Sequence, residues 1–147
     1  MAHAKPIPEG YHSVTPFLAL KEADRAIDFY KRAFGAVEKF RMPGPDGRIL
    51  HAELTIGDST VMLTEAIHEP ASVSSLYLYV ADADAVFDRA VRAGAQVRMP
   101  PADMFWGDRF GSVSDPNGNT WSIATHVEDV PPEEMPKRAQ AAMAQMK

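Results

Sequence analysis

The chain has 147 residues, a formal net charge of −5 and no cysteine. This length is enough for one ordinary domain with a hydrophobic core, and the content of 46% hydrophobic and 24% charged residues is typical of soluble globular proteins. The absence of cysteine excludes disulfides, thiolate nucleophiles and Cys-ligated metals. The negative charge and the lack of a Lys/Arg cluster argue against a nucleic-acid-binding protein.

Common targeting and nucleotide-binding signals are missing as well. No apolar run approaches the roughly 18 residues that a membrane helix needs, and residues 1–10 lack the apolar core of a signal peptide. Neither a P-loop nor a Gly-x-Gly-x-x-Gly turn occurs. We therefore expect a cytoplasmic protein that has no membrane partner and no classical nucleotide site.

The first half of the chain predicts an extended lead-in, a strand, a helix and three further strands. The helix has an apolar stripe at helical spacing and ends before Gly35, which is typical of a C-terminal cap. The third strand alternates clearly, with His51, Glu53 and Thr55 on one face. In chain order the elements are a lead-in over 1–12, strand 14–20, helix 22–34, strand 36–42, a turn over 43–47, strand 49–56, a turn at 57–58 and strand 59–65.

After a linker over 67–74 the same order restarts. The helix is expected to end at Gly94, and the last two strands are joined by Asp115-Pro116-Asn117-Gly118, a strong hairpin signal because Asn-Gly adopts left-handed conformations. Trp121 alternates with polar neighbours and is expected in the core. The elements are strand 75–80, helix 82–93, a short strand 96–99, a loop over 100–107, strand 109–114 and a final strand from 120.

The two halves are related by an offset of 60 residues, which falls to 59 between Gly35 and Gly94 and to 57 between the Arg-Met-Pro triplets at 41–43 and 98–100, before the later loop restores it. Leu20 corresponds to Val80, and Thr60 corresponds to Thr120, with matched residues also in the helices. Neither half has enough elements to bury both faces of its sheet. We therefore expect an α+β fold, a single domain of two βαβββ repeats over 12–66 and 74–126, in which a curved mixed sheet forms a cup with the helices outside. Residues 127–147 form a tail, with a helix expected over 133–146.

Several segments in both halves of the chain have a familiar pattern. They are Ala26-Ile27-Asp28-Phe29-Tyr30 with Ala33-Phe34-Gly35, then His51-Ala52-Glu53-Leu54, and finally Trp106-Gly107-Asp108-Arg109-Phe110-Gly111 followed by Asp115-Pro116-Asn117-Gly118-Asn119. Together they resemble the vicinal oxygen chelate superfamily, which includes glyoxalase I, extradiol dioxygenases, and fosfomycin and bleomycin resistance proteins. The resemblance covers residues 12–126 and is closest to the PhnB-like branch. It implies paired modules around a central site, usually within a homodimer.

Metal-dependent members of that superfamily place a ligand on the first and the last strand of each module. The corresponding positions in this chain are Thr15, Ser75, Met62 and Ser122. A divalent ion takes imidazole or carboxylate ligands, commonly three or more from the protein, and hydroxyls and a thioether are poor substitutes. We therefore expect no cofactor and no metal at these positions.

His51 and Glu53 remain as candidates for chemistry. An imidazole and a carboxylate at i and i+2 of one strand face can point into one cavity. With Glu65 they could form a displaced metal site, or they could act as an acid/base pair without metal. Alternatively, His51 hydrogen-bonds within the sheet face and Glu53 pairs with an arginine.

Other side chains have a functional and a structural interpretation each. Phe105 and Trp106 either form an aromatic lid or pin their own loop. Arg109 either binds an anionic ligand or pairs with Asp108 or Glu53. Tyr77, with Tyr79, either forms a stacking wall or packs in the core.

His12, His68 and His126 are interpreted as surface residues near strand ends or in the linker. In the tail, Met135, Ala139, Ala142, Met143 and Met146 share one helical face, which requires Pro136 in the first turn. The tail helix either contacts a second subunit or frays.

The sequence favours metal-independent binding of a small organic molecule, with drug sequestration as one form of it. The alternatives are a glyoxalase-type lyase, isomerase or dioxygenase with a displaced metal at His51 and Glu53, and a metal-free enzyme using either residue as a base. Whether the protein is an enzyme stays open. The expected lining combines polar and aromatic side chains: Thr15, Phe17, His51, Glu53, Met62, Ser75, Tyr77, Phe105, Trp106, Arg109 and Ser122.

Overall fold

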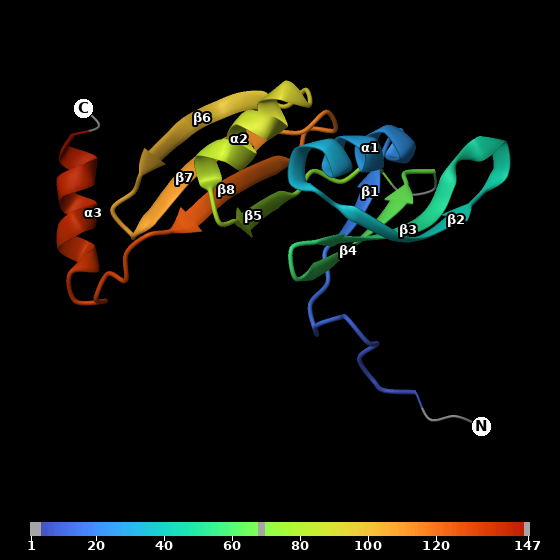
Figure 1. Cartoon of the computed structure of the whole chain (residues 1–147), viewed down its shortest axis with the longest axis horizontal. Coiled ribbons are helices and arrows are strands. Elements are labelled where there is room, and N and C mark those ends of the chain that lie inside the picture. Colours follow the sequence, from blue (N-terminus) through green and yellow to red (C-terminus); the bar gives the residue numbers. More distant parts are fainter. Residues whose placement is uncertain (1–3, 68–69, 146–147) are drawn as a thin grey trace. The chain divides into compact units, whose positions relative to one another are not determined.

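A computed structural model describes residues 4–67 and 70–145, which fall into two compact units (Figure 1). One unit comprises the chain up to Ser74 together with the turn at Pro116–Gly118, and the other comprises Ser75–Asp115 and the chain from Asn119 onward. The His68 prediction falls outside the described residues. Each unit contains one four-stranded sheet with a helix between its first and second strands in chain order, as the repeat predicts, and the second unit also contains the tail helix.

The first unit is a mixed sheet covered by one helix. The strand order is β1-β4-β3-β2, with β1 parallel to β4 and the other pairs antiparallel. Leu18, Leu20, Leu54 and Leu63 are buried with the apolar face of the helix, which forms the core of this unit. The elements are β1 (Phe17–Leu20), α1 (Ala23–Phe34), β2 (Val37–Pro43), a short 3₁₀ turn η1 (Pro45–Gly47), β3 (Ile49–Ile56) and β4 (Ser59–Glu65).

The second unit repeats this arrangement in the order β5-β8-β7-β6, again with the first pair parallel. Phe87, Val113, Trp121 and Ile123 are buried in its core, which confirms the core prediction for Trp121. The Trp121 indole N–H donates to Asp115 at 2.9 Å. The elements are β5 (Ser75–Tyr79), α2 (Ala83–Arg92), β6 (Gln96–Asp103), β7 (Asp108–Ser114), β8 (Thr120–His126) and α3 (Met135–Ala144).

The expected α+β class and the two βαβββ repeats are therefore confirmed, while several boundaries are wrong. β1 begins at Phe17, so Thr15 precedes the strand. β6 continues to Asp103 through Pro100 and Pro101, although the sequence predicts a loop there. Proline lacks a backbone N–H and is tolerated on an edge strand, and β6 is the edge of its sheet, with irregular register at these residues.

The tail begins with an extended segment and ends in α3. Pro136 lies in its first turn, as predicted. Arg138 makes a two-pronged ion pair with Glu128 at 2.8 and 2.7 Å, which ties the helix to the segment before it. Met143 on this helix is 66% exposed. The predicted contribution of Met146 falls outside the described residues.

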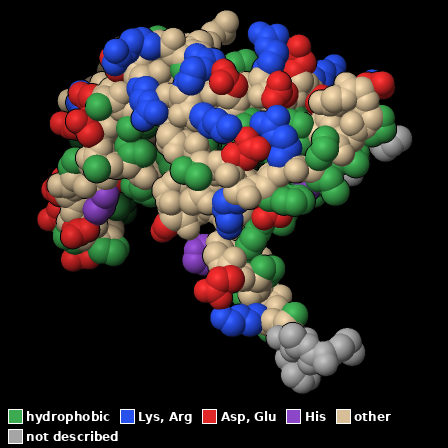
Figure 2. Space-filling model, turned by 45° about the vertical axis from the view of Figure 1, so that its right-hand side comes forward, with side chains coloured by type: hydrophobic (Ala, Val, Ile, Leu, Met, Phe, Trp, Pro, Cys, Tyr) green, Lys and Arg blue, Asp and Glu red, His purple; other side chains and the backbone are tan. Residues whose placement is uncertain are grey.

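Charged side chains of both signs are mixed over the face shown in Figure 2. None of the helices in the described parts of the chain has both the length and the hydropathy to cross a membrane. The mixture of charges agrees with the sequence-based argument against a nucleic-acid surface.

Candidate functional site

A buried carboxylate, Asp108, organises one side of the second sheet. Its Oδ2 accepts hydrogen bonds from the hydroxyls of Tyr77 and Tyr79 at 2.7 and 2.8 Å, and from the indole N–H of Trp106 at 3.1 Å. Its Oδ1 lies 2.9 Å from Nδ1 of His126. Asp108 is 1% exposed, so four donors compensate the burial of its charge.

Local structure explains how these five groups meet. Asp108 and His126 are paired opposite each other at the ends of β7 and β8. Tyr77 and Tyr79 alternate on β5 and therefore project from the same sheet face. The turn before β7 brings Trp106 back over the carboxylate, with Met104 N–H donating to Asp108 O at 2.8 Å.

Hydrogen bonding determines the protonation of this cluster. Burial alone would raise the pKa of Asp108, but the bonds from Tyr77, His126, Tyr79 and Trp106 outweigh it and hold that pKa below its usual value. Burial and the bond to Asp108 raise the pKa of the Tyr77 hydroxyl, so it stays protonated. The bonds to Asp108 and Asp129 raise the pKa of His126.

Aromatic rings extend from this cluster over the sheet face. Tyr77 stacks on Phe110 with 5.6 Å between ring centroids and lies 5.2 Å from Tyr79. Trp106 meets Phe110 edge-on at 5.7 Å and Phe105 at 5.0 Å. We call these five rings the aromatic face: Tyr77, Tyr79, Phe105, Trp106 and Phe110. Tyr77 and Tyr79 are 45% and 59% exposed, although their hydroxyls are fixed.

His51 and Glu53 form a second cluster, on the first sheet. His51 Nε2 lies 3.0 Å from Glu53 Oε2, and Tyr11 from the lead-in donates its hydroxyl to Glu53 Oε1. The bond from Tyr11 holds the pKa of Glu53 below its usual value, even though burial opposes this. In turn, burial and the bond to Glu53 raise the pKa of Tyr11 to about 12. The predicted arginine partner of Glu53 is therefore wrong, because Tyr11 and His51 occupy that role.

Exposed apolar side chains flank this cluster. Phe17, Met62, Glu53 and Phe40 form one row across the four strands. Phe17 and Phe40 are 57% and 49% exposed, and their ring centroids lie 6.1 and 6.3 Å from that of His51. His51 thus stands beside two exposed phenyl rings.

Two predicted partnerships differ from the structure. Arg109 makes a two-pronged ion pair with Asp84 at 2.9 and 3.1 Å and reaches Asp103 at 3.5 Å, so its predicted pairing with Asp108 or Glu53 is wrong. Glu65 accepts the backbone N–H groups of Glu22 and Ala23 at the start of α1 and does not join His51.

The four positions at which metal-dependent relatives carry ligands lie as follows. Met62 pairs with Phe17, and Ser122 pairs with Tyr77, which confirms the 60-residue register. Ser75 begins β5, and Thr15 donates to His12 O at 3.4 Å. Within residues 4–67 and 70–145, no three His, Asp or Glu side chains converge to hold a metal ion. His51 and Glu53 provide only two of the three or more protein ligands that a divalent ion commonly takes.

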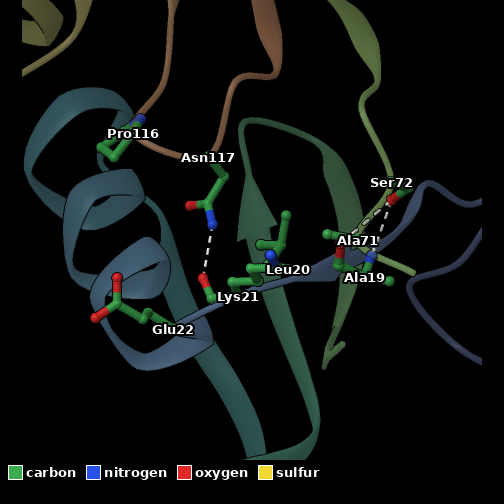
Figure 3. A pocket seen from close by; sticks show the side chains of 8 residues that line it. All are labelled: Ala19, Leu20, Lys21, Glu22, Ala71, Ser72, Pro116 and Asn117. Atoms are coloured by element: carbon green, nitrogen blue, oxygen red, sulfur yellow. Dashed lines mark hydrogen bonds between the residues drawn. The ribbon is translucent and has the colours of Figure 1, made fainter. Parts of the chain in front are cut away.

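A cavity of about 330 Å³ lies in the first unit at the start of α1 (Figure 3). Asn117 donates to the Lys21 carbonyl at 2.6 Å, and Ser72 Oγ accepts from Ala19 N at 3.1 Å. None of the site residues predicted from the sequence lines it. Its lining is Ala19, Leu20, Lys21, Glu22, Ala71, Ser72, Pro116 and Asn117.

Asp108, His126 and Tyr11 are the residues that sequence reasoning missed as site components. The 120–126 strand and its hairpin partner could have indicated the pairing of Asp108 with His126, because hairpin register follows from the turn. No local pattern indicates Tyr11, which lies outside the repeat and reaches Glu53 over 42 positions.

Comparison with known proteins agrees with this fold. The model of the Glyoxalase/Bleomycin resistance protein/Dioxygenase superfamily matches residues 11–123, and the chain belongs to this superfamily. An uncharacterised protein of Mycobacterium bovis is 42% identical over 144 residues, covering 90% of this chain and 92% of the relative.

Solved structures with the same fold include two for which the sequence identity exceeds 25%. TioX from Micromonospora sp. ML1 has a TM-score of 0.67 and 29% identity, covering 82% of this chain and all (100%) of TioX. TnmS3 from Streptomyces sp. CB03234, described as an antibiotic binding protein, has a TM-score of 0.62 and 26% identity, covering 78% of this chain and 97% of TnmS3.

Proposed function

We propose that this protein binds a small, planar organic molecule on the aromatic face, without a metal ion. The observation behind this is that Tyr77 and Tyr79 expose their rings while Asp108 fixes their hydroxyls. A rigid aromatic surface loses little side-chain freedom when a ligand stacks on it. Drug sequestration is the form that we favour, since TnmS3 is described as an antibiotic binding protein.

The two tryptophans make the binding measurable. Trp121 is 2% exposed and buried in the core, whereas Trp106 belongs to the aromatic face. Titration with a panel of polycyclic aromatic antibiotics should therefore quench Trp106 fluorescence in a saturable way, in buffer containing a chelator. Trp106→Phe should abolish the quenching, while calorimetry still detects binding.

Phe110 tests the stacking surface without touching the Asp108 bonds. Phe110→Leu should weaken binding about two- to tenfold, since an aromatic pair is worth about 0.5–1.5 kcal/mol beyond its buried area. Val14→Ala, at an 86% exposed residue that precedes β1, is the matched control and should bind like the parent. Absence of saturable binding across the panel would refute the proposal.

Metal independence has its own test. Elemental analysis of protein purified without added metal should find no stoichiometric Zn, Ni, Mn or Fe. A stoichiometric metal that is lost in His51→Ala would instead favour the glyoxalase-type enzyme with a displaced site. Turnover of a bound ligand would likewise contradict simple sequestration.

We further propose that the protein acts as a cytoplasmic homodimer. The exposed apolar surface of α3, with Met143 66% exposed, supports a subunit contact. Light scattering on the full chain and on a variant ending at residue 134 measures this. A monomeric mass for the full chain would refute the dimer.

A further inference from the structure

His51 uses one of its two ring nitrogens. Nε2 lies 3.0 Å from Glu53 Oε2, and within the described chain no protein group hydrogen-bonds to Nδ1. The His51 side chain is 23% exposed, so a small molecule can reach the ring, and the bond to Glu53 holds the ring in place. One nitrogen is thus a fixed anchor and the other is available.

Glu53 determines which nitrogen bears the proton. Both carboxylate oxygens are occupied, Oε1 by the Tyr11 hydroxyl and Oε2 by His51. An ionised carboxylate only accepts hydrogen bonds, so the proton between Glu53 and His51 belongs to Nε2. The Lys39 ammonium lies 5.1 Å from the centre of the Tyr11 ring and adds positive charge to this side of the cluster. In the neutral imidazole, Nδ1 therefore presents a bare lone pair.

The surroundings of His51 favour an aromatic ligand. Phe17 meets the imidazole edge-on and Phe40 lies tilted against it, and both phenyl rings remain about half exposed. Aromatic rings prefer such edge-to-face and offset partners. A ligand ring that packs beside these phenyl rings lies next to Nδ1 of His51, which is a hydrogen-bond acceptor. The site therefore favours a ligand that carries a hydrogen-bond donor.

We propose that Nδ1 of His51 accepts the hydroxyl hydrogen of an aromatic ligand, a phenol in the simplest case, whose ring lies against Phe17 and Phe40. This proposal rests on the proposed function for the class of ligand, an aromatic small molecule, but it places that ligand on different residues. Glu53 is a positioning residue that fixes the tautomer, and Tyr11 positions Glu53.

An acidic phenol also transfers its proton. The O–H bond breaks, its electron pair stays on oxygen as phenolate, and the proton forms a new bond to Nδ1. The resulting imidazolium lies between the phenolate and the Glu53 carboxylate, which stabilise its charge from both sides. No co-reactant is required.

Paired chromophores test the acceptor. 4-Nitrophenol has the hydroxyl, and 4-nitroanisole has the same ring with the oxygen methylated. We expect 4-nitrophenol to bind about two- to tenfold more tightly, since a hydrogen bond between neutral groups contributes about 0.5–1.5 kcal/mol and 1.4 kcal/mol is tenfold. Its absorbance should shift toward that of nitrophenolate. His51→Phe should remove the preference and the shift, whereas His12→Phe, at an exposed histidine of the lead-in, should keep both. Equal binding of the two chromophores would overturn the proposal.

Glu53→Gln tests the tautomer. With Tyr11 donating to the amide oxygen, the amide NH₂ faces His51 Nε2, which must then accept, so Nδ1 acquires the hydrogen. The preference for 4-nitrophenol should be lost, because Nδ1–H can donate to the oxygen of either chromophore. Tyr11→Phe combined with Glu53→Gln frees the amide to turn over and should restore part of the original preference. An unchanged preference in Glu53→Gln would refute the positioning role.

Nitrogen-15 NMR of the ligand-free protein reads the tautomer directly. His51 should show a protonated Nε2 in the parent and a protonated Nδ1 in Glu53→Gln. A protonated Nδ1 in the neutral parent imidazole would overturn the inference whatever the antibiotic panel shows. Conversely, if no antibiotic of the panel binds to the aromatic face, the proposed function is refuted, while the chromophore and NMR results still stand.

Discussion

Glu65 and Thr125 occupy equivalent positions in the two repeats, 60 residues apart, and each caps the helix of its own unit. Glu65 Oε1 accepts the N–H of Ala23 at 3.2 Å, and Thr125 Oγ1 accepts the N–H of Ala83 at 2.8 Å. The first N–H groups of a helix have no acceptor within the helix. Each repeat supplies an acceptor from the strand that comes last in its chain order. The repeat thus conserves the position of the cap while the side chain differs.

Loss of either cap should destabilise the protein. We expect Glu65→Ala and Thr125→Val to lower the free energy of unfolding by about 1 kcal/mol each, which is the usual value of a capping bond. Urea denaturation followed by circular dichroism measures this. Asp58→Ala, at an exposed turn residue, is the control and should change stability by less than about 0.5 kcal/mol. Equal stabilities for all three variants would contradict the capping role.

Glu22 precedes α1 in a left-handed conformation, with φ of 53°. A side chain in this region costs about 1–2 kcal/mol, and glycine avoids that cost. We expect Glu22→Gly to be more stable than Glu22→Ala by about 0.5–1 kcal/mol in the same denaturation experiment, because both variants lose the carboxylate and only one loses the strain. The reverse order would show that the backbone relaxes at this position.

Much of the fold could be predicted from the sequence, because alternation and the repeat determine strand faces. The pairing of Phe17 with Met62 and of Tyr77 with Ser122 follows the predicted register. The site was less predictable. The predicted pairing of Arg109 with its neighbour Asp108 was wrong, since consecutive strand residues project to opposite faces. The strand alternation visible in the sequence already argues against that pairing.

Long-range contacts account for the features of the site that could not be predicted from the sequence. Tyr11 reaches Glu53 from a lead-in with no periodic pattern, and Asp108 acquires its donors from β5, β8 and the turn at Trp106. Such contacts depend on where whole elements meet. Sequence periodicity describes one element at a time and cannot predict them.

Asp108 and His126 should give the stability a defined pH dependence. The folded pKa of Asp108 is lowered, so its contribution is present above its unfolded pKa of about 3.9 and is lost as the pH falls through the folded value. The folded pKa of His126 is raised, so its contribution is complete below its unfolded pKa of about 6.5 and is lost as the pH rises through the folded value. The free energy of unfolding should therefore be greatest between these two unfolded pKa values.

Variants separate the two groups in that pH profile. Asp108→Asn should cost about 3 kcal/mol at neutral pH, because an amide presents hydrogens to donors that need an acceptor. It should also flatten the acidic limb and weaken the alkaline limb, because Asp108 is the main cause of the raised pKa of His126. His126→Asn should flatten the alkaline limb but keep most of the acidic limb, because Tyr77, Tyr79 and Trp106 still bond to Asp108. Thermal unfolding between pH 3 and pH 9 measures both, and an unchanged profile in either variant would contradict the assignment.

Gly107 allows the tail to approach the turn before β7. Its φ is 102°, and a Cβ at this position would overlap the carbonyl oxygen of Glu128, whose own N–H donates to Gly107 O at 3.0 Å. Gly118 has a similar φ of 86° but open space around it. Gly118→Ala should therefore cost only the backbone strain, about 1–2 kcal/mol, whereas Gly107→Ala should cost about 3 kcal/mol or more because backbone must also move. Hydrogen exchange should show the extra loss at the N–H groups of Val127 and Glu128. Equal costs for the two variants would show that the tail shifts without resistance.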